Sequence, residues 1–80
     1  MTHSILRLPA VKASTGLSRS TLYLRIAQGV FPKPVSLGAR AVGWLAGEVK
    51  ALNAARTSGK SDSEVRDLVT KLEAARKAAE

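Results

Sequence analysis

The stretch STGLSRSTLYLRIAQG, residues 14–29, constrains the architecture of this chain more strongly than any other part of it. Gly16 can adopt the positive φ that ends a preceding helix. Ser18 is a favourable N-cap for a following helix, because its hydroxyl can accept a backbone N–H bond from the first turn. Gly29 can then end that second helix. The pattern predicts a helix-turn-helix whose second helix, about 15 Å long at the usual rise per residue, fits a DNA major groove.

The second helix carries most of the candidate DNA contacts. Its first turn presents donors at the helix end whose partial positive charge favours phosphate. Arg19 could reach a guanine or a phosphate there, and Tyr23 follows one turn later on a largely outward position. Arg25 is a less certain contact, because its position on the wheel lies beside the inward stripe. An ordinary capped helix in a small core would share this pattern. The candidate contacts are Ser18, Arg19, Ser20, Thr21, Tyr23 and Arg25.

The distribution of charge favours the DNA-binding interpretation. The net charge is +7, and residues 1–47 contain six Lys or Arg side chains and no Asp or Glu. Residues 48–80 contain seven basic and six acidic side chains. A solvated surface usually mixes both signs, whereas a wholly basic half-domain indicates a polyanionic partner. The charges are spread through a patterned fold and not along one amphipathic helix, which argues against a membrane surface.

Composition excludes several other classes. Eighty residues form one domain with a small core, and the absence of cysteine excludes disulfides and thiolate metal sites and fits a reducing cytoplasm. No long apolar run predicts a signal peptide or a membrane span. His3 has no partner at catalytic or metal spacing, and the carboxylates, Glu48 and Glu73 among them, are typical of solvent-facing or pairing residues on helices. We therefore expect neither enzymatic activity nor a cofactor.

Residues 30–45 predict a small β-hairpin, or wing. Pro32 and Pro34 keep the chain extended, and apolar residues then alternate in the manner of strands on either side of a turn at residues 37–40. This turn places Arg40 near the tip, while Lys33 lies in the extended segment; both are candidate DNA contacts. Trp44 is expected in the core, although an exposed ring that stacks on bases is the alternative.

Three further helices are expected, over residues 9–14, 46–56 and 61–80, and residues 5–8 form a short strand or an extended lead-in. Ser61 and Glu64 have the spacing of a capping box. The last helix carries an apolar stripe of Val65, Leu68, Val69, Leu72, Ala75 and Ala79. This stripe could pack on its own domain or pair with a second copy, and of the two we expect a homodimer on DNA. The expected organisation is a DNA-binding domain over residues 1–56 and an amphipathic helix within residues 57–80.

The run LRLPAVKASTGLSRSTLYLRIAQGVFPKPVSLGARAVGW, residues 6–44, resembles the AlpA-type phage and prophage regulators. The likeness covers roughly residues 5–56 and is specific in the combination of TGLSRST, Tyr23, FPKP, Arg40 and Trp44. It implies a mostly α fold with a small β-hairpin, a winged helix-turn-helix related to MerR-like and excisionase domains. The helix after Ser18 would read the major groove, and the hairpin around Arg40 would touch the DNA backbone or the minor groove.

The resemblance implies a sequence-specific transcriptional regulator of phage or prophage genes, in the bacterial cytoplasm at the nucleoid. The alternative is an excisionase-type recombination directionality factor, which would bend DNA and assist an integrase. Expected partners are double-stranded DNA, a second copy in a homodimer, and RNA polymerase or an integrase. A pure protein-interaction module would rest on the last helix alone, and the basic first half argues against it. Leu52 stands where family members often carry tryptophan, and Asn53 follows it, so looser packing is expected there.

Overall fold

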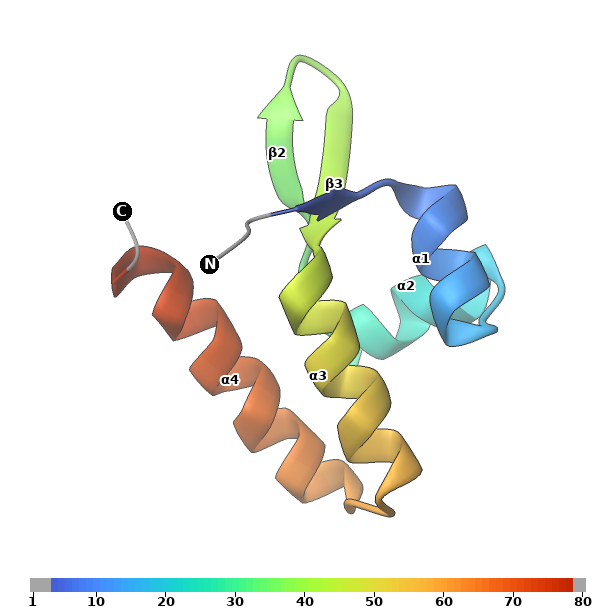
Figure 1. Ribbon diagram of the computed structural model, residues 1–80, viewed down its shortest axis with the longest axis vertical. Helices are drawn as coiled ribbons and strands as arrows, with labels where there is room; N and C mark the ends of the chain where they lie inside the picture. The colour runs from blue at the N-terminus through green and yellow to red at the C-terminus, as the bar shows by residue number, and fades with distance from the viewer. Residues whose placement is uncertain (1–3, 79–80) are drawn as a thin grey trace.

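The computed structural model describes residues 4–78 and shows a winged helix-turn-helix followed by a C-terminal helix (Figure 1). The elements are β1 (Ile5–Leu6), α1 (Leu8–Thr15), α2 (Arg19–Ala27), β2 (Val35–Gly38), β3 (Ala41–Leu45), α3 (Ala46–Thr57) and α4 (Asp62–Ala78). The predicted fold, mostly helical with a small hairpin, is confirmed. His3, Ala79 and Glu80 lie outside the described residues, so the expectations that fall on them stay untested.

Local capping explains why α1 and α2 begin and end where they do. Gly16 has a φ of +72° and its N–H bonds to the Lys12 carbonyl at 2.8 Å, which ends α1. The Ser18 hydroxyl accepts the N–H of Thr21 at 3.2 Å, as an N-cap does. Gly29, at a φ of +79°, forms a turn in which two backbone N–H groups return to carbonyls of the last turn of α2.

The sheet contains three antiparallel strands in the order β1-β3-β2. The first alternative for residues 5–8, a short strand, is therefore correct for Ile5 and Leu6, which pair with the end of β3. Gly43 lies at the centre of β3, opposite Val35. A Cβ atom at Gly43 would collide with Cγ2 of Ile5 and lie 3.1 Å from the Leu6 carbonyl oxygen. The absence of a side chain at Gly43 thus lets β1 and the hairpin pack closely.

The core draws on all four helices, β3 and the segment after α2. Trp44 is fully buried, and its Nε1–H donates to the Pro32 carbonyl at 3.1 Å. The interpretation of Trp44 as a core residue is confirmed, and the alternative of an exposed ring for base stacking is wrong. The buried apolar residues are Val11, Leu22, Val30, Phe31, Trp44, Val49, Leu52, Ala55, Val65 and Val69.

Helix α4 lies alongside α3 and closes the core of its own chain (Figure 1). The predicted capping box is present: the Ser61 N–H donates to Glu64 at 3.0 Å, and the Glu64 N–H donates to the Ser61 hydroxyl at 3.2 Å. Val65 and Val69 are buried in the common core, with 0% and 4% of their surfaces exposed. A dimer built on this stripe would have to displace these contacts with α3.

The structure tests two expectations about α3. Leu52 is only 2% exposed, and the amide of Asn53 donates to the carbonyl and the hydroxyl of Ser14, both at 3.1 Å, so that α3 is tied to α1. Leu52 is therefore packed in the core, although a surface hollow lined in part by Leu52 and Asn53 lies beside it. Of the two roles expected for Glu48, facing solvent or pairing, the second is correct: Glu48 is 6% exposed and pairs with Arg76 on α4.

Candidate nucleic-acid interface

The first turn of α2 forms an open, positively polarised helix end. No acidic side chain lies in this turn. The Ser18 hydroxyl donates to Thr21 Oγ1 at 3.0 Å while it accepts the Thr21 N–H, so both residues are engaged in capping. Ser20 is exposed, with its hydroxyl 3.5 Å from that of Ser18. The capping pair therefore fixes the shape of the helix end, and Arg19 and Ser20 are the side chains left to reach outward.

Arg19 is held against an aromatic pair that joins α2 to the sheet. Its Cζ lies 5.3 Å from the ring centroid of Tyr23, which is a cation–π geometry. The Tyr23 ring meets Trp44 of β3 edge to face, with centroids 6.3 Å apart and an interplanar angle of 70°. Tyr23 is half-buried and not largely outward as expected. Its ring positions Arg19 and also links the helix to the base of the hairpin.

The structure separates Arg25 and Lys33 from this group. Arg25 is half-buried on another flank of α2, beside a surface hollow that Asn53 and Arg56 of α3 also line. Lys33 precedes β2 and has an exposed side chain, while its backbone is bonded by α4: its N–H donates to Glu73 at 2.9 Å, and its carbonyl accepts from Arg76 at 2.7 Å. Lys33 is therefore at the root of the wing and not on its tip.

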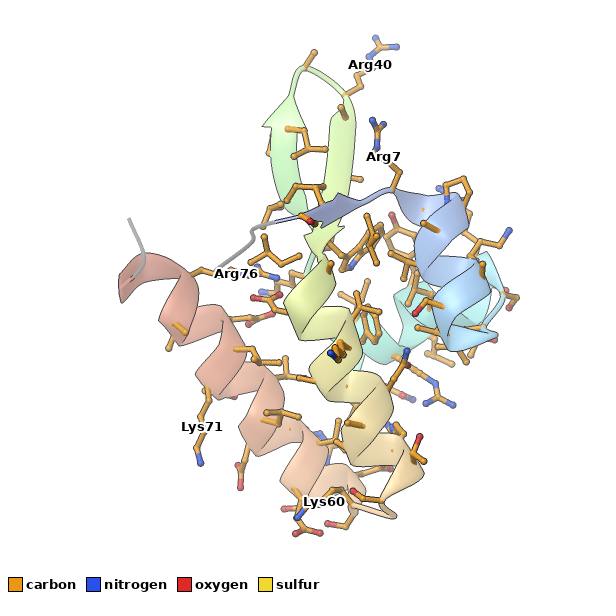
Figure 2. The ribbon with its side chains drawn as sticks, in the orientation of Figure 1. Arg7, Arg40, Lys60, Lys71 and Arg76 are labelled. Carbon is orange, nitrogen blue, oxygen red and sulfur yellow. The ribbon has the colours of Figure 1, made fainter. Side chains whose placement is uncertain are left out.

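Arg40 lies at the tip of the hairpin, where the chain turns between β2 and β3. Figure 2 shows Arg40 and Arg7 projecting beside the hairpin, whereas Lys60 lies at the opposite end of the molecule and Lys71 on the outer side of α4. Sequence reasoning counted Arg7 only as part of the basic half. Its position near the wing follows from the pairing of β1 with β3, which brings the residue after β1 to the hairpin.

Leu24 is a second residue that sequence reasoning missed. It is 56% exposed, the highest exposure among the large apolar side chains of residues 4–78. The helical wheel places it with Ser20 and Ala27, at i−4 and i+3, on the face of α2 opposite the buried Leu22. All three are exposed. The spacing alone could therefore have identified Leu24 as the apolar centre of the outer face.

No group of three or more His, Cys, Asp or Glu side chains within residues 4–78 could hold a metal ion. Over the same residues, no helix combines the length and the apolar character that crossing a bilayer requires.

Comparison with known proteins decides the family. Residues 4–57 match the model of the family described as prophage CP4-57 regulatory protein (AlpA). The chain belongs to this AlpA family. It is 51% identical over 55 residues to uncharacterized protein ORF88 of Enterobacteria phage P4, covering 69% of this chain and 62% of that protein. It is 41% identical over 51 residues to the DNA-binding transcriptional activator AlpA of Escherichia coli (strain K12), covering 56% of this chain and 73% of that protein.

The AlpA-family match confirms the resemblance seen in the sequence and marks where it stops. It includes β1, the helix-turn-helix, the hairpin and α3, and it ends with the last residue of α3. Every candidate contact of α2 and the wing lies inside the matched residues. Helix α4 lies beyond them, although it is part of the same core. This chain spans less than two thirds of the length of the phage P4 protein.

Proposed function

We propose that this AlpA-family protein is a sequence-specific DNA-binding transcriptional regulator of phage or prophage genes. The observation that carries the proposal is that one small core presents two basic elements of a size that fits the grooves of DNA. One is the open first turn of α2 with Arg19, and the other is the hairpin with Arg40 at its tip and Arg7 beside it. The description of the E. coli relative as a DNA-binding transcriptional activator supports the same class.

In this proposal α2 enters the major groove. Arg19 and Ser20 meet base edges or phosphates, and the capped helix end formed by Ser18 and Thr21 presents free backbone N–H groups to a phosphate. Tyr23 contributes through its hydroxyl and by holding Arg19, and Arg25 contacts the flank of the groove. The wing approaches a phosphate or a narrow minor groove through Arg40, while Lys33 at its root adds affinity more than specificity.

Assembly on DNA is a separate proposal. We propose that two copies bind neighbouring half-sites, about 34 Å or one turn of the DNA helix apart, as other helix-turn-helix dimers do. Because Val65 and Val69 face α3 in the same chain, such a dimer would need a surface other than the centre of the α4 stripe. Stoichiometry on the selected duplex, from sedimentation of the complex, tests this. Contact with RNA polymerase, or with an integrase, stays a prediction.

The test begins with selection of duplexes from a randomised library, followed by anisotropy titrations between about 50 and 200 mM salt. We expect log K to fall against log salt with a slope of about −3 to −4 per protomer, because about four cationic side chains reach phosphates. Arg19→Ala should weaken binding by about 1–3 kcal/mol if Arg19 contacts a guanine, and should weaken all duplexes alike if it contacts a phosphate. A reporter gene behind the selected site then measures regulation.

Lys71→Ala is the matched control, since Lys71 is an exposed cation on the outer side of α4, away from the hairpin (Figure 2). It removes the same charge and should change affinity little. A salt slope near zero would overturn the DNA-binding proposal. Wild-type binding by a folded Arg19→Ala variant would overturn the assignment of Arg19.

A further inference from the structure

Helix α4 lies outside the matched family region, yet it contacts the segment that joins the two proposed DNA-reading elements. This segment, residues 28–34, is called the linker here because it runs from the end of α2 to the start of β2. Its backbone accepts or donates four hydrogen bonds with side chains in the described part of the chain. One comes from Trp44, and the other three come from α4.

The three α4 side chains that bond the linker form one row along the helix. Arg66 Nε donates to the Gln28 carbonyl at 3.0 Å, next to the C-terminal end of α2. Glu73 accepts the N–H of Lys33 at 2.9 Å, and Arg76 donates to the Lys33 carbonyl at 2.7 Å. The spacing of i, i+7 and i+10 places the three on one side of α4, at the edge of its buried face.

Arg76 also joins the linker to α3. Its Nε donates to one carboxylate oxygen of Glu48 at 2.9 Å and its Nη2 to the other at 2.5 Å, in the bidentate geometry that guanidinium favours. Glu48 is 6% exposed and lies in the first turn of α3, so the pair is largely removed from water. The same guanidinium therefore fixes α3, α4 and Lys33 relative to one another.

We propose that α4 sets the position of the wing relative to α2 by holding both ends of the linker. Arg66, Glu73 and Arg76 are then positioning residues for DNA recognition, although they lie outside the elements proposed to touch DNA. The physical reason is that β2 is an edge strand bonded only to β3, while β1 pairs only with the Trp44 and Leu45 end of β3. The rest of the hairpin is therefore a two-stranded ribbon, which can tilt about its base unless the segment that leads into β2 is held. Bonds to Gln28 and Lys33 remove that freedom. This inference rests on the proposed function in its DNA-binding part.

The alternative is that α4 only completes the core through Val65 and Val69. A charge-neutral pair of double variants separates the two roles. Arg66→Ala plus Glu73→Ala removes two linker bonds and leaves the buried valines in place. Asp67→Ala plus Lys71→Ala removes one acid and one base from the exposed side of the same helix, and is the matched control. Both leave the net charge unchanged, so non-specific electrostatic attraction to DNA is equal.

The first measurement needs no DNA. Amide hydrogen exchange of β2 and β3 should be faster in the Arg66→Ala plus Glu73→Ala variant, while exchange of α1 and α3 stays as in wild type. The control variant should match wild type throughout, and Glu73→Gln, whose amide oxygen can still accept the Lys33 N–H, should keep the hairpin protected. Unchanged exchange of the hairpin would overturn the inference, whatever the protein binds. If the double variant does not fold, the two single variants are measured in the same way.

The second measurement is a double-mutant cycle with Arg40→Ala on the selected duplex, at a temperature where circular dichroism shows every variant folded. Arg40→Ala should lose less affinity in the Arg66→Ala plus Glu73→Ala background than in wild type, with a coupling of about twofold or more. Additive losses would show that α4 does not position the wing. If wild type bound no duplex, the proposed function would fail, and hydrogen exchange alone would still decide whether α4 holds the hairpin.

Discussion

Replacing Gly43 with alanine should destabilise the protein, although the change adds a single methyl group. The new Cβ would collide with Cγ2 of Ile5 and would lie 3.1 Å from Leu37 Cδ1 and from the Leu6 carbonyl oxygen. Ile5 is β-branched and the Leu6 oxygen belongs to a paired strand, so moving either group away from the new Cβ would cost free energy. Overpacking of this kind costs about 1–3 kcal/mol, which the general preference of strands for alanine over glycine offsets by about 0.5–1 kcal/mol.

Gly47→Ala is the matched control, because it makes the same chemical change where no atom lies within 4 Å of the added Cβ. Gly47 is in the first turn of α3, where alanine should stabilise by up to about 1 kcal/mol. The Tm should therefore fall in the Gly43→Ala variant and rise in the Gly47→Ala variant, by about 4–8 °C per kcal/mol for a domain of this size. Shifts of the same sign and similar size would refute the argument that close packing of β1 on β3 requires glycine at position 43.

Three further outcomes are expected. Arg40→Ala should weaken binding to selected and random duplexes equally and reduce the salt slope by about one, whereas no loss on either duplex would remove Arg40 from the interface. The pKa of Glu64 is held below 4.5 by hydrogen bonds from the Ser61 backbone and hydroxyl, and by the charge of Lys60. Its contribution to stability is therefore present above about pH 4.5 and lost as the pH falls, so Glu64→Gln should be less acid-sensitive than wild type, and equal pH dependence would contradict this. Leu24 should contact the methyl group of a thymine. Replacing that thymidine with deoxyuridine should then weaken binding by about 0.8 kcal/mol for the wild type and should not change the affinity of the Leu24→Ala variant, whereas equal losses in the two proteins would exclude the contact.

The parts of the fold that depend on neighbours in sequence could be predicted. The caps at Gly16, Ser18 and Ser61 require only residues within one or two turns, and all three form as expected. The hairpin follows in the same way from alternation and from the prolines that precede it. These signals are local because the backbone groups that they satisfy lie within a few residues of the side chains that satisfy them.

The parts that depend on distant pairing could not be predicted. Asn53 looked like a polar gap in α3, because its partner Ser14 is 39 residues away and belongs to α1. Glu48 could be described only as a solvent-facing or pairing residue for the same reason, since its guanidinium partner lies 28 residues later. In the candidate site, the sequence identified Arg19 and Arg40 as contacts. It could not show that Tyr23 packs against Trp44, or that the pairing of β1 with β3 places Arg7 beside the wing.

Helix α4 shows the limit of periodicity most clearly. A 3-4 spacing of apolar residues establishes that one face is covered, but a second copy and the same chain would cover it equally well. The polar side chains at the edge of that face are more informative, because each of them needs a hydrogen-bond partner at its own position along the helix. Glu73 and Arg76 find theirs on the backbone of Lys33, where the wing begins. The face of α4 is therefore matched to its own domain by its polar edge, and the apolar stripe alone could not have distinguished that arrangement from a dimer.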